Sequence, residues 1–187
     1  MDTATAVLRK EHEAILKMLA VTEEVARRVE GGEQVEPEIL ANLLEFFRLF
    51  ADKCHHGKEE DLLFPQLEKK GMPRTGGPVG VMLAEHDQGR QLIQQMAKAT
   101  EAYPNQPATA GPAWTQAARG YVDLLRAHIA KEDNVLFVMA ERMLTPEEQT
   151  ALAEGFEKIE VEKMGAGTHE RLHAMMAKLI KDILPPG

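Results

Sequence analysis

The sequence predicts an all-α protein: an up-down-up-down four-helix bundle with additional short C-terminal helices. Alanine, leucine, glutamate and lysine recur throughout the 187 residues, and aromatic residues make up only 5%, as is typical of helical proteins. Glycine and proline divide the chain into four long segments. In each, apolar side chains recur at steps of three and four residues and so form one stripe along a helix. A histidine interrupts that stripe near the middle of every segment.

Each of the four segments predicts one helix of the bundle. Thr145-Pro146-Glu147-Glu148 then reads as a capping box with proline at the first helical position, which predicts a fifth helix toward Val161. Thr168 can cap a sixth helix that runs to about Ile183. We expect the bundle to occupy residues 1–145, and a C-terminal helical extension over residues 146–187 to pack on it. The four long helices are expected at about residues 3–30, 37–70, 78–102 and 112–144.

Charge and hydropathy exclude several classes of partner. The net charge of -8 and the absence of a lysine or arginine block argue against nucleic acid and against anionic membrane. No apolar run approaches the about 20 residues that span a bilayer, and the first residues have no leader pattern. We therefore expect a cytoplasmic protein. The C-terminal helices would either cover the bundle or form the interface of a homodimer.

An internal repeat divides the predicted bundle into two helix hairpins. His55 to Phe64 and His128 to Phe137 both read H-x-x-K-E-x-x-x-L-F. Glu11-His12-Glu13 and Glu85-His86-Asp87 both read E-H-acid. The two pairs of matches are offset by 73 and 74 residues. Two such hairpins packed with approximate two-fold symmetry make a four-helix bundle.

The repeated histidines and glutamates indicate a metal site in the core. A histidine and a glutamate four residues apart lie on one face of a helix. If each were only a core residue, four histidines and two carboxylates would be buried at one level, where unpaired charge costs several kcal/mol each. A metal pair removes that cost. The predicted ligands are His12, His55 and Glu59 from one half and His86, His128 and Glu132 from the other.

The donor types narrow the choice of metal. Cys54 is the only cysteine, so no intrachain disulfide forms and a thiolate-rich site is excluded. Imidazole and carboxylate suit iron, manganese or zinc, and carboxylate-bridged pairs in helical bundles are typically di-iron or di-manganese. We expect iron, with manganese and zinc as alternatives.

The register of the second helix has two solutions, because His56-x-x-x-Glu60 competes with His55-x-x-x-Glu59. Alignment of the two repeats on their shared Leu-Phe pair matches Glu59 with Glu132, and hence His55 with His128. On this alignment we expect His55→Ala to lose metal and His56→Ala to keep most of it.

The ordered motifs resemble the hemerythrin-like (HHE cation-binding) family over about residues 5–145. His12, His55-x-x-x-Glu59, His86-x-x-x-Arg90 and His128-x-x-x-Glu132 are similar to its H, HxxxE, HxxxR, HxxxE branch. The resemblance implies an oxo- or hydroxo-bridged di-iron centre that interacts with oxygen, peroxide or nitric oxide, with Glu59 and Glu132 as bridging carboxylates. Peroxide turnover or redox and oxygen sensing is favoured. A reversible oxygen carrier or an iron-handling protein is the alternative, and whether the protein is an enzyme stays open.

Arg90 departs from the oxygen carriers of that family, which have a fifth histidine at this position. Arginine cannot bind a metal. The position would be filled by water, by an exogenous ligand, or by His169 or Glu160 from the C-terminal segment. Alternatively, Arg90 pairs with a carboxylate beside the site such as Glu85 or Glu160 and acts only indirectly.

A second motif lies near the C-terminus. His169-Glu170-Arg171-Leu172-His173 fits the H-E-x-x-H pattern of zinc metalloproteases. Such an enzyme needs a further ligand and a sheet edge that holds the substrate, yet only fourteen residues follow and no strand pattern is present. A zinc metalloprotease is therefore a remote alternative.

Overall fold

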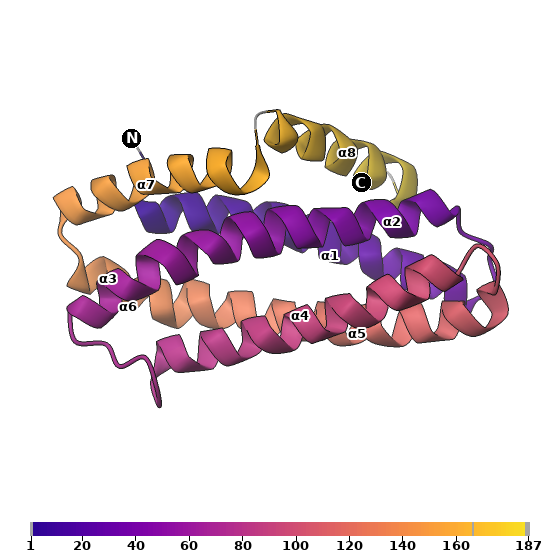
Figure 1. Cartoon of the computed structure of the whole chain (residues 1–187), viewed down its shortest axis with the longest axis horizontal. Helices are drawn as coiled ribbons and strands as arrows, with labels where there is room; N and C mark the ends of the chain where they lie inside the picture. Colours follow the sequence, from indigo (N-terminus) through magenta and orange to yellow (C-terminus); the bar gives the residue numbers. More distant parts are fainter. Residues whose placement is uncertain (1, 166, 186–187) are drawn as a thin grey trace.

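The computed structural model describes residues 2–165 and 167–185, and over these residues the chain is all-helical (Figure 1). Four antiparallel rods form the bundle. The first is α1 (Ala4–Glu30) and the third is α4 (Pro78–Ala102). The second rod runs through α2 (Pro37–Phe46), η1 (Phe47–His56), η2 (Glu59–Leu63) and α3 (Phe64–Lys69), and the fourth through α5 (Pro107–Lys131), η3 (Glu132–Leu136) and α6 (Phe137–Met143).

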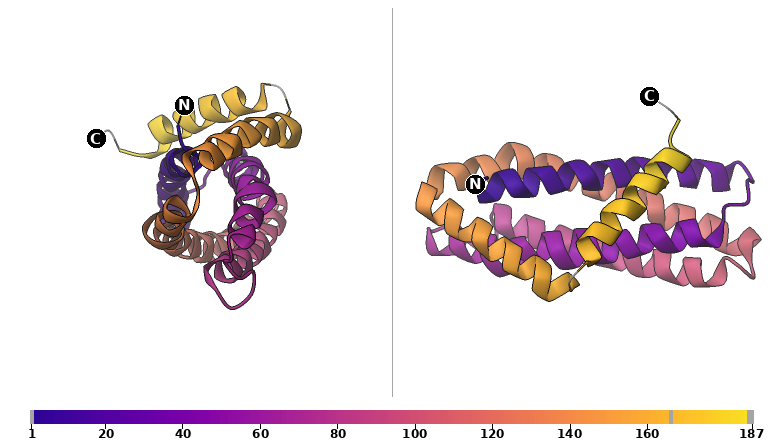
Figure 2. Two further views of the ribbon diagram at one scale, coloured as in Figure 1. Left: turned by 90° about the vertical axis from the view of Figure 1, so that its left-hand side faces the viewer. Right: turned by 90° about the horizontal axis from the view of Figure 1, so that it is seen from above.

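The up-down-up-down arrangement agrees with the predicted fold class. Seen end on, the four rods surround one axis, and α7 (Pro146–Met164) and α8 (Thr168–Ile183) lie across one side of them (Figure 2). α7 contacts α1 and η1, and α8 contacts α1 and α2. None of the described helices is long and apolar enough to cross a membrane.

Three stretches labelled η are π-helices, which the sequence does not predict. In a π-helix the backbone hydrogen bonds run from residue i to i+5, so each turn holds more residues than an α-turn. η2 and η3 occupy equivalent places in the two repeats, and each begins at the glutamate of its H-x-x-K-E motif. The regular hydrogen-bond ladder is therefore broken at the level of the repeated polar residues, as is frequent at functional sites.

Two hydrophobic clusters make up the core, and the repeated polar residues lie between them along the bundle. The larger cluster contains Phe47, Trp114 and Tyr121, and the smaller one contains Leu8, Phe64 and Phe137. On the first three rods the sequence positions of the polar layer fall between the members of the two clusters, and on the fourth rod Glu132 does so while His128 precedes Ile129, the last member of the larger cluster. The layer is consequently enclosed by apolar side chains at both ends.

Two predicted boundaries need correction. The fourth rod begins at Pro107 and not near residue 112, and Pro112 lies inside α5, because a proline in the first turns of a helix removes few hydrogen bonds. Thr168 is the first residue of α8 and not its cap; Gly167 precedes it with φ 77°. The capping box at Thr145 is present as predicted, with the Thr145 hydroxyl accepting from the Glu148 N–H at 3.3 Å.

Candidate metal centre

The six predicted ligands meet in the polar layer, and a seventh residue, His56, joins them. Two groups of four residues each present one donor atom, and the four donor atoms lie within 4.8 Å of one another. All of these side chains are buried. We call the groups site A, which consists of His12, His55, Glu59 and Glu132, and site B, which consists of His56, Glu59, His86 and His128.

Both glutamates face the two sites with opposite oxygens. The Glu132 Oε2 atom lies 3.1 Å from His12 Nε2, and its Oε1 atom lies 3.2 Å from His128 Nε2. The Glu59 Oε1 atom lies 3.7 Å from His55 Nε2, and its Oε2 atom lies 3.4 Å from His86 Nε2. A carboxylate placed in this way can bind one ion through each oxygen, which is the geometry of a bridging ligand.

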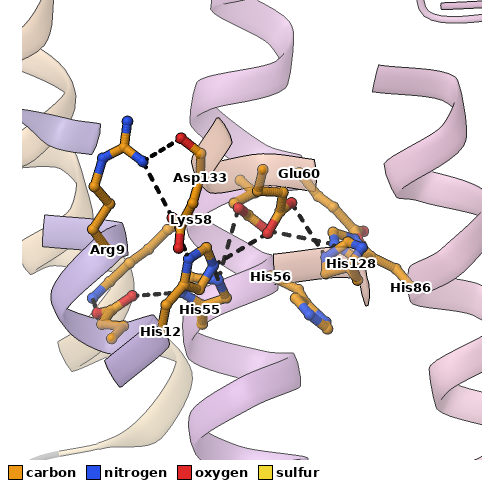
Figure 3. Close-up of polar contacts among 12 residues, drawn as sticks. Arg9, His12, His55, His56, Lys58, Glu60, His86, His128 and Asp133 are labelled. Carbon is orange, nitrogen blue, oxygen red and sulfur yellow. Dashed lines mark hydrogen bonds and ion pairs between the residues drawn. The ribbon is translucent and has the colours of Figure 1, made fainter. Parts of the chain in front are cut away.

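The imidazoles form two matched pairs whose Nε2 atoms converge. His12 Nε2 and His55 Nε2 are 3.0 Å apart, and His86 Nε2 and His128 Nε2 are 3.1 Å apart. The other ring nitrogen of each histidine contacts a carboxylate, and Figure 3 labels Glu60 and Asp133 among these acids. A carboxylate at Nδ1 favours the tautomer with its proton there and leaves the Nε2 lone pair for a metal.

The four carboxylates at Nδ1 repeat with the approximate two-fold symmetry of the chain. Within each hairpin, the glutamate that precedes the first histidine contacts the second: Glu11 contacts His55 at 2.8 Å, and Glu85 contacts His128 at 2.9 Å. Between the hairpins, Asp133 contacts His12 at 2.8 Å and Glu60 contacts His86 at 2.7 Å.

The repeated lysine of the H-x-x-K-E motif completes this arrangement. Lys58 donates to Glu11, and Lys131 donates to Glu85. Lys58 is 1% exposed, which is rare for lysine unless it is paired. These acids and lysines surround the six predicted ligands but were not themselves predicted as part of the site. Their signal was present in the sequence, because they recur beside the ligands in both repeats.

The carboxylates of Glu59 and Glu132 are not satisfied by hydrogen bonds from the described residues. Among the described residues, both carboxylate oxygens of Glu59 and of Glu132 are buried without a hydrogen-bond partner, although imidazole nitrogens lie within 4 Å of them. The nitrogens are near but are not aligned as donors. Because an unpartnered buried carboxylate costs several kcal/mol, the donor set fits a pair of metal ions bound between the imidazoles and the carboxylates.

The electrostatics of the two sites favour positive charge. Burial alone would lower the pKa of His12, but Asp133 and Glu132 raise it to about 10. Burial likewise opposes the charged form of His86, and Glu59 and Glu60 raise its pKa to about 9. Each of these imidazoles therefore holds a proton where no metal takes its place. Metal uptake must release such protons, since a metal binds the neutral imidazole.

His56 differs from the four paired histidines and was not among the predicted ligands. Burial and the neighbouring His86 lower the pKa of His56 well below its ordinary value, so its ring is neutral. Nδ1 of His56 lies 3.4 Å from Asp52 Oδ1, and a proton there leaves the Nε2 lone pair for a metal. The ring stacks on His86 with centroids 3.8 Å apart. In a regular α-helix His55 and His56 would point about 100° apart. Both lie in the π-helical η1, where His55 belongs to site A and His56 belongs to site B.

Arg90 does not pair with either predicted partner. Its guanidinium donates to Glu60 at 2.7 Å, to Asp52 at 2.9 Å and to Asp87 at 3.1 Å. Of the predicted partners, Glu85 contacts His128 and Lys131, and Glu160 contacts Lys58. The prediction that Arg90 pairs with a carboxylate beside the site is correct, but the naming of Glu85 or Glu160 was wrong, because the Glu60 carboxylate on the adjacent rod lies closer.

A cavity of about 270 Å³ opens beside site B. It reaches His56 and His86 from the surface, and the charged side chains of its wall are Arg48, Asp52 and Arg90. The two C-terminal candidate ligands lie elsewhere. Neither Glu160 nor His169 belongs to site A or site B; Glu160 accepts from Lys58 at 3.2 Å, and His169 Nε2 lies 3.6 Å from Glu160 Oε1.

Comparison with known proteins agrees with this geometry. An uncharacterized protein of Mycobacterium tuberculosis and one of Mycobacterium bovis are each 28% identical over 183 residues, which is 97% of this chain and 70% of the relative. The iron-sulfur cluster repair protein YtfE of Salmonella newport is 32% identical over 120 residues, which is 62% of this chain and 54% of that protein. No solved structure matches the chain. The model of the hemerythrin HHE cation-binding domain matches residues 3–140, which include every donor of sites A and B, and the chain belongs to that family.

Proposed function

We propose that the protein binds a di-iron pair, one ion in site A and one in site B, and that it belongs to the H, HxxxE, HxxxR, HxxxE branch of its family. The observation that carries the proposal is the placement of Glu59 and Glu132. Each glutamate directs one carboxylate oxygen to a histidine of site A and the other oxygen to a histidine of site B. Imidazole and carboxylate donors without sulfur suit iron, with manganese and zinc as alternatives. A bound pair would supply the redox chemistry of small oxygen species.

His56 would supply site B with an additional imidazole, in place of the fifth histidine that oxygen carriers of the family have at the position of Arg90. Site B then has three imidazoles, and site A has two. Arg90 acts through Glu60, which contacts both the Arg90 guanidinium and His86 Nδ1 at 2.7 Å. The arginine thereby fixes the orientation of a proposed ligand. Because its donors are already bound to three carboxylates, its charge is largely neutralised toward the cavity.

We further propose that hydrogen peroxide is the substrate and that two peroxide molecules are converted to one oxygen molecule and two water molecules. The support is the cavity beside site B, which admits a small molecule and has Asp52, Arg48 and Arg90 in its wall. Ionisable side chains along the approach assist proton movement. Reversible oxygen binding is favoured by a pocket that excludes water. Redox sensing would use the same approach.

A reversible oxygen carrier is the second candidate, and His56 is the residue that favours it. With His56 the two sites contain five imidazoles in total, the number that the resemblance associates with oxygen carriers. The Salmonella relative is named for the repair of iron-sulfur clusters, and the match covers 54% of that protein.

Metal analysis and two kinetic measurements test the proposal. We expect about two iron ions per chain in purified or iron-reconstituted protein, and loss of iron in Glu132→Gln. Glu30→Gln is the matched control, because Glu30 is a glutamate in an exposed ion pair with Arg119. The iron protein should consume hydrogen peroxide faster than the same concentration of free iron, with oxygen release. No iron, and no iron uptake, would refute the di-iron proposal. A stable oxygen complex through repeated deoxygenation, with no peroxide loss, would instead favour the carrier.

A further inference from the structure

A third pair of histidines, outside sites A and B, has the geometry of the two pairs inside them. His169 and His173 lie one turn apart on α8, and their Nε2 atoms are 3.1 Å apart. Their rings are inclined at 61° with centroids 4.3 Å apart. The corresponding values are 59° and 4.6 Å for His12 and His55, and 62° and 4.8 Å for His86 and His128.

A carboxylate completes the group from the neighbouring helix. Glu160 of α7 places its Oε1 atom 3.6 Å from His169 Nε2, while its Oε2 atom accepts from Lys58 at 3.2 Å. Lys58 therefore orients the Glu160 carboxylate and leaves the other oxygen facing His169. The side chains of His169 and Glu160 are 33% and 30% exposed, so an ion can reach them from solvent. Phe50 packs against both imidazole rings on the opposite side.

The donor set and spacing suit a divalent transition metal. Two imidazoles bound to one zinc ion at about 2.0–2.1 Å with a tetrahedral angle have nitrogens about 3.3–3.4 Å apart. The observed 3.1 Å differs by a few tenths of an ångström. The two imidazole nitrogens already converge as a pair of ligands. The Glu160 carboxylate lies next to His169 only, and the three donor atoms do not all lie within 4.8 Å of one another, so a small rotation of the Glu160 side chain would bring in the third ligand and leave a position open for water. Burial and the adjacent His169 lower the pKa of His173, so its lone pair is available at neutral pH.

We propose that His169, His173 and Glu160 form a metal site, separate from sites A and B, that binds one zinc-like divalent ion and ties α7 to α8. The ion would link the two helices across Gly165 and Gly167, both of which have positive φ. The donor atoms of Glu11, Cys54 and Glu160 also lie within 4.8 Å of one another, but the Lys58 ammonium donates to both glutamates and already supplies a positive charge there.

The arrangement does not fit the protease suggested by the H-E-x-x-H motif. The glutamate of that motif acts as general base beside the ion, whereas Glu170 is exposed and the carboxylate next to His169 is that of Glu160. The described residues are all helical and offer no sheet edge for a peptide. The site is therefore proposed as a structural link between helices.

Zinc binding to the iron-loaded protein tests the proposal. We expect equilibrium dialysis against micromolar zinc, followed by elemental analysis, to give one additional zinc per chain with no loss of iron. His169→Ala and His173→Ala should each weaken zinc binding at least 100-fold, and Glu160→Gln about 10-fold. Glu170→Gln is the matched control and should bind zinc as the parent does. Cobalt in place of zinc should give visible bands that disappear in the His173→Ala variant.

The outcomes separate this site from sites A and B. If zinc binds only with release of an equal amount of iron, or binds equally well in the His169→Ala/His173→Ala double variant, the proposal is wrong. Absence of zinc uptake at micromolar concentration would also overturn it. The conservative variants His169→Asn and His173→Asn provide a second test if the alanine variants lose iron or helical content, since asparagine retains a polar group in the partly exposed position.

Discussion

Replacement of His56 is the sharpest test of the difference between the sequence repeat and the structure. The repeat alignment predicts that His56→Ala keeps most of the metal, because only His55 matches His128. In the structure His56 is buried at 3% exposure and belongs to site B with Glu59, His86 and His128. We now expect His56→Ala to weaken the ion of site B selectively.

The magnitude follows from the number of donors. Site B would keep Glu59, His86 and His128 of its group, together with the bridging oxygen of Glu132. Loss of a residue that only orients a ligand typically costs about 10–100-fold in metal affinity, so loss of a ligand itself should cost at least about 100-fold, or about 2.7 kcal/mol. Site A does not contain His56 and should retain its ion. In competition with a chelator of intermediate affinity, iron content should therefore fall from about two to about one per chain.

A nearby substitution provides the control for this experiment. Lys53 lies on the same π-helical segment as His56 but is exposed, so Lys53→Ala should keep both ions. Circular dichroism of the metal-free proteins would separate ligand loss from unfolding. If His56→Ala retains two iron ions with unchanged affinity, His56 is a packing residue, and the expectation from the repeat alignment holds.

Three further predictions concern the surroundings of the sites. Arg90→Lys should lower iron affinity about tenfold, because lysine cannot contact Glu60 and Asp52 at the same time, as the planar guanidinium does. Arg119→Lys, in an exposed ion pair, is the control. If Arg90→Lys binds iron as tightly as the parent, the role of Arg90 is contradicted. Removal of iron should lower the melting temperature by about 5–10 °C in calorimetry. Metal at about 100 times its Kd contributes about 2.7 kcal/mol to the free energy of unfolding, and about 1 kcal/mol shifts the melting temperature of a domain of this size by about 2–4 °C. An unchanged melting temperature would show that the glutamates are satisfied without metal. Burial raises the pKa of Cys54 to about 12, so at pH 8 the thiolate fraction is on the order of 10⁻⁴. A disulfide reagent should therefore modify Cys54 at least 100-fold more slowly in the folded than in the denatured protein. Equal rates would place this thiol at the surface.

The sequence predicts the bundle and the meeting of six polar residues because both follow from periodicity. A histidine in an apolar stripe must face the core when the stripe does, and the repeat gives each half the same set. The same reasoning excludes His56, since neighbouring residues of an α-helix point about 100° apart. A change from α- to π-type hydrogen bonding leaves the apolar stripe almost unaltered, so the pattern of residues does not reveal it.

Contacts between rods are the other part that the sequence does not predict. Periodicity selects the face of a helix on which Arg90 lies but not the residue of another helix that it meets. Glu60, Asp52 and Asp87 are its partners, and the first two come from a different rod. Lys58 illustrates the same limit, because its burial depends on Glu11 and Glu160, which are distant in sequence.

The crossed carboxylate contacts also bear on how such a centre could arise by gene duplication. Glu11 and Glu85 each contact a histidine of their own hairpin, whereas Glu60 and Asp133 contact a histidine of the other. Two copies of one ancestral hairpin, associated as a symmetric dimer, would therefore supply every one of these contacts without a fused chain. Fusion then permits the copies to diverge.

The divergence is visible at two positions. His56 is matched in the other repeat by Ile129, which is 3% exposed, and Arg90 is matched by Leu16, which is 38% exposed. Both changes fall around site B and its cavity. The two proposed ion sites are in this way unequal, because site B has a third imidazole and a cavity beside it that opens to solvent, whereas among the described residues site A has neither.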